Sequence, residues 1–153
     1  MKKFLQKKLN NEKGMTLIEL LAVIVIIAII AAIAIPAIGN IIENSRYSAI
    51  KADATNIMAA ADVYFADGNS GASVTIAQLT SAGYLEDPGS FKTGTTVTKS
   101  VAGATPAPAK ISGNTEVGNI KLTFTNVSRD LVNSLKRGET LPTGIAVTPA
   151  AQS

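Results

Sequence analysis

The feature that most constrains this chain is an apolar run near its N-terminus. No residue from Leu20 to Ile35 is polar or charged, and the run reaches Ile38 with Pro36 as its only interruption. A helix needs about 20 apolar residues to cross the hydrocarbon core of a membrane. We therefore expect a transmembrane segment at about residues 17–38.

Charge is distributed unevenly along the 153 residues. The first fourteen contain five lysines and one glutamate, a charge of +4, and the remaining nine basic and ten acidic side chains give −1. Because basic flanks resist translocation, we expect the N-terminus inside the cell and the residues beyond about Asn40 outside. The basic character belongs to the N-terminal tail. DNA is therefore a conceivable partner that the charge pattern does not indicate.

Composition removes several classes of enzyme from consideration. The chain has no Cys, His or Trp, which excludes His-based triads, Cys nucleophiles and Cys/His zinc sites. Asp53, Asp62 and Asp67 have no metal-ligand spacing, and we expect them on a solvated helix face. The sequence predicts a protein that is not an enzyme and has no metal and no cofactor.

Helical character continues after the apolar run. Between Ala49 and Ala66, apolar side chains recur at spacings of three and four residues, as in an amphipathic helix. These residues are Ile50, Ala54, Ile57, Ala61, Tyr64 and Phe65. The turn-forming sequence at 68–71 then ends the pattern. We predict one helix of about 50 residues over 15–67.

The remaining residues, 68–153, predict a small extracytoplasmic head. Thr75 and Gln78 have the spacing of a capping box, which indicates a short helix over 76–82 followed by a turn at 84–89. Alternation of apolar and polar residues predicts a strand over 119–127. Weaker signals suggest an edge strand at 95–101, a loop at 105–108, a helical turn at 128–136 and a strand at 144–148.

Together these elements define an α+β fold. A long N-terminal helix, with a membrane half and an amphipathic half, is expected to pack on a small antiparallel sheet. We divide the chain into a basic leader (1–14), the helix (15–67) and the head (68–153).

The boundary between the leader and the apolar run is the most informative region. Glu19 stands one position before the uninterrupted apolar stretch, where a carboxylate is costly unless it is paired. Lys13 is six residues away and lies on a different helical face. If the chain were cut after Gly14, the new α-amine of Met15 would lie one helical turn from Glu19 and could pair with it.

Residues 13–42 resemble the N-terminus of the type IV pilin and pseudopilin family. Gly14 matches the last leader residue, Met15 the first mature residue and Glu19 the fifth, and Pro36 falls where the family usually has proline. The resemblance implies cleavage between Gly14 and Met15 by a prepilin peptidase and N-methylation of Met15. It also implies assembly, by pilus assembly machinery, into a helical filament of many copies. The subunit would be a single-pass membrane protein before assembly and part of a surface pilus afterwards.

The chain departs from the family pattern in three places. Met15 replaces the usual Phe, and Ala28 stands where many members have a helix-loosening Gly. Many pilins also close the end of the head with a Cys pair, which this chain lacks. We therefore expect the region 128–148 to be held by packing alone. The residues expected to pack there are Leu131, Leu135, Ile145 and Val147.

A conventional signal peptide is the alternative interpretation. Ala32-Ile33-Ala34 forms an A-x-A site after an apolar stretch, and cleavage after Ala34 would release or anchor a binding module. Single features also have simpler explanations. Glu19 could be an ordinary boundary residue, and Pro36 could be only a helix kink. Asn126-Val127-Ser128 fits a glycosylation sequon, although Ser128 also suits a helix N-cap.

Overall fold

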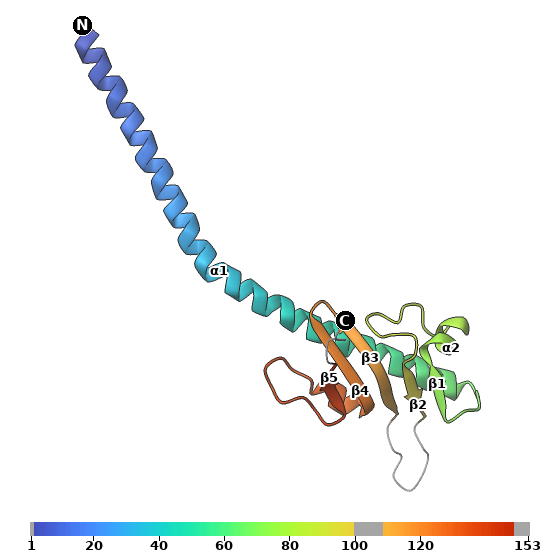
Figure 1. Cartoon of the computed structure of the whole chain (residues 1–153). Helices are drawn as coiled ribbons and strands as arrows, with labels where there is room; N and C mark the ends of the chain where they lie inside the picture. The colour runs from blue at the N-terminus through green and yellow to red at the C-terminus, as the bar shows by residue number, and fades with distance from the viewer. Residues whose placement is uncertain (1, 100–108, 149–153) are drawn as a thin grey trace, which may run out of the picture. The chain divides into compact units, whose positions relative to one another are not determined.

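The computed structural model of the chain describes residues 2–99 and 109–148, with side chains from Thr16 onwards. The chain forms two compact units, residues 1–42 and 43–153. The first consists of the N-terminal part of helix α1, whose bounds are Lys2–Ala66 (Figure 1). The helix ends close to the predicted position, but it begins in the leader rather than at residue 15. The leader has no helix breaker before Gly14, which explains why the helix continues through it.

The second unit contains a five-stranded sheet in the order β1-β2-β3-β4-β5, with every neighbouring pair antiparallel. The strands are β1 (Ser73–Thr75), β2 (Thr96–Thr98), β3 (Lys110–Val117), β4 (Ile120–Ser128) and β5 (Ile145–Val147). The last part of α1 packs against this sheet, as Figure 1 shows. The predicted α+β fold is therefore confirmed.

The core of the head forms between α1 and the sheet. Helix residues at three- and four-residue spacing are fully buried and meet buried strand residues. The principal members are Ile50, Ala54, Ile57, Met58, Ala61, Ile111, Leu122, Phe124 and Val127. The rings of Phe91 and Phe124 meet edge to face with centroids 5.2 Å apart, a preferred aromatic geometry. The predicted amphipathic half of the helix is confirmed.

Helix α2 (Ile76–Ser81) forms as predicted because its first turn is capped. Thr75 Oγ1 accepts a hydrogen bond from the Gln78 N–H at 3.2 Å, and Gln78 Oε1 accepts one from the Thr75 N–H at 2.8 Å. This reciprocal pair satisfies donors that a helix N-terminus leaves free. Ile76 and Leu79 then lie in the core.

The longest pairing in the sheet includes a strand that was not predicted. β3 pairs with β4 through a two-residue turn at Gly118-Asn119, where Gly118 has φ of +58°. Glycine at the first central position of a hairpin turn is favoured because it adopts positive φ without strain. The residues Gly118-Asn119 are a sequence signal for a hairpin turn. β3 has few large apolar residues, so its sequence lacks the alternating pattern that identifies a strand.

Two smaller predictions require correction. The strand expected at 95–101 is β2, which lies between β1 and β3 and is not an edge strand. Val147 in β5 is 66% exposed and does not join the packing of Ile145, because β5 is the edge of the sheet. Ser128 ends β4 and is the N-cap residue of helix α3 (Arg129–Asn133), as expected, although its side chain makes no cap hydrogen bond. The loop predicted at 105–108 lies outside the described residues.

Candidate assembly and processing site

The first unit exposes nearly all of its apolar side chains. Sixteen large apolar residues lie between Leu17 and Ile42, and each is 46–71% exposed. Soluble proteins rarely expose a contiguous apolar surface of this size, so it must be covered by lipid or by another protein. Within the described residues, α1 supplies one stretch that is long and apolar enough to cross a membrane.

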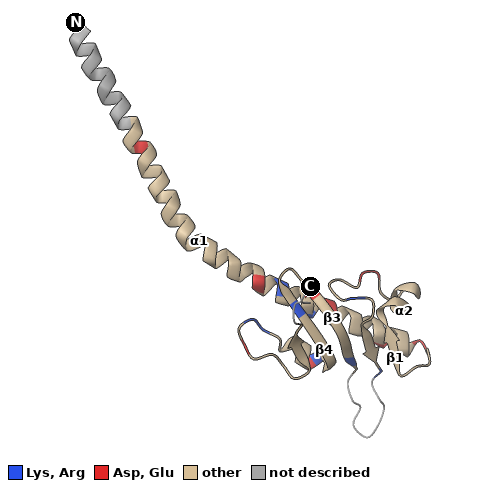
Figure 2. Ribbon diagram, viewed as in Figure 1, with Lys and Arg blue, Asp and Glu red and all other residues tan. Residues whose placement is uncertain are grey.

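Glu19 is the one charged residue between Thr16 and Ile42 (Figure 2). It lies in α1, four residues after Met15, so the two positions share one helical face. No ion pair among the described residues includes Glu19. A carboxylate in this position would need a cationic partner if the surrounding helix surface were covered by apolar groups.

The bond between Gly14 and Met15 lies inside α1. A peptidase that cut this bond would need the backbone extended there, so it would have to unwind the helix locally. Glycine makes such unwinding easier, because it is less stable in a helix interior than alanine by about 0.5–1 kcal/mol.

Pro36 also lies inside α1. Its ring nitrogen has no hydrogen to donate to the carbonyl four residues earlier, which weakens the helix at that turn. The kink that the sequence suggests at Pro36 remains a prediction. Together the backbone places Gly14, Met15, Glu19 and Pro36 on one continuous helix.

Within the second unit, three aspartates attach separate segments of the head to the end of α1. Asp53 Oδ2 accepts hydrogen bonds from the Ser90 N–H at 2.8 Å and from its hydroxyl at 2.6 Å. Asp62 pairs with Arg129 at 2.8 Å, and just after the helix Asp67 accepts a 2.8 Å bond from the hydroxyl of Tyr84. Asp62 and Asp67 are exposed, as expected, and Asp53 is half-buried. The sequence did not predict that all three would bond to other segments of the head.

The contact at Asp53 is the closest of the three. A Cβ atom added at Gly89 would lie 2.3 Å from the Asp53 carboxyl carbon, so only glycine allows this approach. Ser90 also accepts a 2.8 Å hydrogen bond from the hydroxyl of buried Thr115. The segment after α2 is thus fixed both to α1 and to β3. The sequence did not predict the contact between Asp53 and Ser90, because these residues are 37 positions apart.

The end of the head is held by packing and ion pairs in place of a disulfide. Leu135 is fully buried, Ile145 is 6% exposed, and Leu131 packs partly against the core. Arg137, which follows α3, forms an ion pair with Glu43 of α1. Three of the four predicted packing residues therefore contribute, together with a charge contact that the sequence did not predict.

Two hydrogen bonds on the head surface shift the pKa values of Tyr84 and Glu116. The bond to the Asp67 carboxylate raises the pKa of Tyr84, because the neutral phenol is the donor. The hydrogen bond from Lys121, at 2.9 Å, lowers the pKa of Glu116. Glu116 is exposed and Tyr84 is half-buried. Each shift comes from one hydrogen bond to a neighbouring charged side chain, as also occurs in structural contacts.

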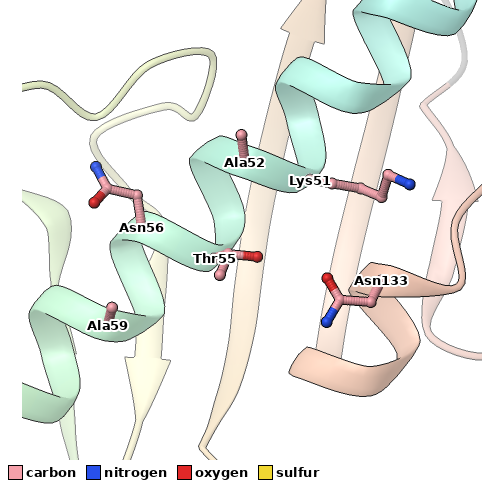
Figure 3. A pocket seen from close by; sticks show the side chains of 6 residues that line it. All are labelled: Lys51, Ala52, Thr55, Asn56, Ala59 and Asn133. Atoms are coloured by element: carbon pink, nitrogen blue, oxygen red, sulfur yellow. The ribbon is translucent and has the colours of Figure 1, made fainter.

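One groove of the head has a largely neutral lining. This groove has a volume of about 470 Å³. The residues that line it are Lys51, Ala52, Thr55, Asn56, Ala59 and Asn133 (Figure 3). Its walls are small apolar and neutral polar groups, with one amine. Among the residues whose side chains are described, no cluster of three or more metal-binding side chains occurs.

Comparison with known proteins identifies a sequence motif in the N-terminal segment. Residues 9–35 match the protein-family model described as the prokaryotic N-terminal methylation motif. Neither curated protein sequences nor solved structures give a match to the chain. The chain therefore carries, over residues 9–35, the class III signal peptide of type IV pilins, consistent with a type IV pilin or pseudopilin. This segment includes Gly14, Met15 and Glu19.

Proposed function

We propose that the chain is the precursor of a structural subunit of a type IV pilus-like filament. The observation that carries this proposal is the exposed apolar surface of α1, which contains a single carboxylate inside the matched segment. A protein that stays in the membrane needs no such carboxylate. A filament of stacked helices can use it to align neighbours.

In this proposal a prepilin peptidase removes residues 1–14 and methylates the amine of Met15. Residues 17–38 anchor the mature subunit in the membrane, N-terminus inside, and residues 68–153 form the extracytoplasmic head. The pilus assembly machinery then moves many copies into a surface filament. DNA recognition has no support from the second unit, because residues 43–153 contain nine basic and nine acidic side chains.

Glu19 is the residue that sets the alignment. When the subunit leaves the bilayer, its carboxylate enters a setting of low dielectric constant between apolar helices, where an unpaired charge is strongly disfavoured. Pairing with the Met15 amine of an adjacent subunit removes this penalty in one axial register. The apolar residues provide most of the adhesion, and the charge pair determines the position.

Mass spectrometry of the mature N-terminus tests this function against its alternatives. An N-methylated Met15 is the expected result. An N-terminus at Ile35 would identify a conventional signal peptide cleaved after Ala34, and an intact Met1 would identify an unprocessed membrane anchor. Either of these two results would exclude a processed pilin. Electron microscopy of wild-type cells and of a deletion strain then shows whether the chain forms filaments.

A further inference from the structure

A basic hollow lies at the beginning of the head. It has a volume of about 260 Å³ and is formed by the first turns of α1 in the second unit and by the residues that follow α3. The lining residues are Asn44, Tyr47, Ser48, Lys51, Leu135, Lys136 and Arg137. Three are cationic, three are neutral and polar, and none is acidic.

The two acidic residues near this hollow do not line it. Glu43 contacts Arg137 through the guanidinium Nε, and this contact does not use the two terminal nitrogens. Glu139 pairs with Lys136 at 3.4 Å, and both side chains are about 60% exposed. Exposed ion pairs contribute little free energy. An anion can therefore compete for these donors, and the five charged groups leave a net charge of +1.

The donor set suits a phosphate group better than other anions. A guanidinium offers planar paired donors that match phosphate oxygens, and ammonium groups add charge-assisted hydrogen bonds. Lys51 approaches from α1, whereas Lys136 and Arg137 come from the segment after α3. The cations therefore reach the hollow from two separate elements, as is needed to enclose a tetrahedral anion.

The sequence indicates where such a phosphate would come from. Asn44 follows the last residue of the apolar run, Ile38, by only six positions. Even fully extended, six residues span about 20 Å, so the hollow stays within reach of the membrane surface. Phospholipid headgroups are the phosphate groups concentrated there, and an anionic headgroup attracts basic side chains within about a Debye length on either side of a membrane.

We propose that this hollow binds a phosphate group, supplied by the headgroup of an anionic phospholipid while the subunit is anchored in the membrane. Bound lipid would hold the head at the membrane surface, and leaving the bilayer for a filament would require its release. The inference rests on membrane anchoring and not on filament assembly.

The test uses the ¹⁵N-labelled full chain in micelles of a non-ionic maltoside detergent. Nuclear magnetic resonance follows the backbone amides during titration with dihexanoyl-phosphatidylglycerol, dihexanoyl-phosphatidylcholine or inorganic phosphate. We expect phosphatidylglycerol to cause saturable shifts at Asn44, Lys51 and Lys136. Because the readout is resolved by residue, binding of lipid to the leader lysines is observed separately.

Two exposed lysines provide a matched pair of variants. Lys136 and Lys92 are 63% and 66% exposed, and each forms one long ion pair with a glutamate. Lys136→Gln should weaken phosphatidylglycerol binding at the hollow about fivefold, as expected for loss of a charge-assisted hydrogen bond. Lys92→Gln should leave it unchanged.

The three titrants separate the possible sources of the anion. Saturable shifts with phosphatidylglycerol alone would support binding of a lipid headgroup. Equal shifts with inorganic phosphate would also support a phosphate-binding site, but its ligand would then be a soluble phosphate. The proposal is overturned if neither titrant shifts these amides. It is also overturned if phosphatidylcholine acts as strongly as phosphatidylglycerol, or if Lys136→Gln and Lys92→Gln behave alike.

Discussion

The two parts of α1 have the same secondary structure but are stabilised in different ways. In residues 43–66, one side of the helix is buried against the sheet, and Ile50, Ala54 and Ile57 have no exposed surface. In residues 16–42 the helix has apolar side chains all round, and its large ones are 46–71% exposed. In residues 43–66 the apolar face is covered by the sheet of the same chain. The apolar surface of residues 16–42 must be covered by lipid or by other molecules.

This difference shows how one helix can serve two purposes. A helix that is apolar on all sides is typical of a membrane span or a fully enclosed core. An amphipathic helix needs one apolar partner surface, and here the sheet supplies it. The charged residues follow the same division, because Glu19 has no ion-pair partner among the described residues while Asp62 pairs with Arg129. Substitutions in residues 16–42 should affect assembly, and those in residues 43–66 should affect folding.

The largest expected effect is the loss of filaments when Glu19 is replaced. Glu19→Leu keeps the helix apolar and keeps the cleavage site, so the subunit should be processed and accumulate in the membrane. Without the carboxylate to pair with a neighbouring amine, we expect few or no filaments by electron microscopy. Glu86→Leu makes the same change at an exposed position of the head and should assemble normally. Normal filaments in Glu19→Leu cells would show that Glu19 is only a boundary residue.

Processing should depend just as strongly on Gly14. Gly14→Val adds a branched side chain before the proposed cut and makes helix unwinding harder, so uncleaved precursor should remain in the membrane. Gly39→Val introduces the same side chain in the same unit, where nothing lies within 4 Å of an added Cβ atom. Immunoblotting should show the mature size for Gly39→Val and the precursor size for Gly14→Val. Normal cleavage of Gly14→Val would place the processing site elsewhere.

Removing the same side chain in the two parts of α1 compares them directly. Ile57 is fully buried and Ile27 is 58% exposed. Ile57→Ala should lower the free energy of unfolding of the head by about 2–5 kcal/mol, because it leaves a cavity. Ile27→Ala should change it by less than about 0.5 kcal/mol. Denaturant unfolding of both variants in non-ionic detergent measures their free energies of unfolding. Equal losses of unfolding free energy would contradict the division of α1 into a part buried against the sheet and an exposed part.

Much of this division could be predicted from sequence, because periodicity is a local signal. The apolar run, the amphipathic pattern after Ala49 and the capping box at Thr75 each depend on residues a few positions apart. The alternation of apolar and polar side chains in β4 likewise identified that strand. The class of the N-terminal segment was implied by its resemblance to the pilin family at Gly14, Met15, Glu19 and Pro36.

The long-range contacts could not be predicted. β3 contains few large apolar residues, and its strand is stabilised by pairing with β2 and β4 rather than by its own pattern. The hydrogen bonds of Asp53 and Asp62 cannot be predicted until the positions of Ser90 and Arg129 are known. Val147 has the alternation of a core residue, but its exposure depends on β5 being the edge of the sheet. Each of these features requires knowledge of which distant segments meet.

A smaller effect is expected from the anchor at Asp53. Asp53→Ala removes the acceptor of two hydrogen bonds from Ser90 and should cost about 1–2 kcal/mol of unfolding free energy. Hydrogen exchange at the Ser90 amide should accelerate. Asp87→Ala removes an exposed acceptor from the same loop, where the carboxylate accepts one bond from the Gly89 N–H at 2.8 Å, and should have little effect. Unchanged exchange at Ser90 in Asp53→Ala would show that other contacts hold the loop.

The smallest effect concerns the surface pair of Glu116 and Lys121. The folded-state pKa of Glu116 is lowered from 4.5 by the hydrogen bond from Lys121. A lowered pKa means that the pair stabilises the fold above pH 4.5 and that this contribution is lost as pH falls through the folded-state pKa. Wild-type protein should therefore have a higher Tm than Glu116→Gln near neutral pH, and the gap should narrow below about pH 4.5. Glu86→Gln controls for the loss of one negative charge. If the difference in Tm between wild-type protein and Glu116→Gln increased on acidification, the hydrogen bond from Lys121 would not favour the ionised carboxylate.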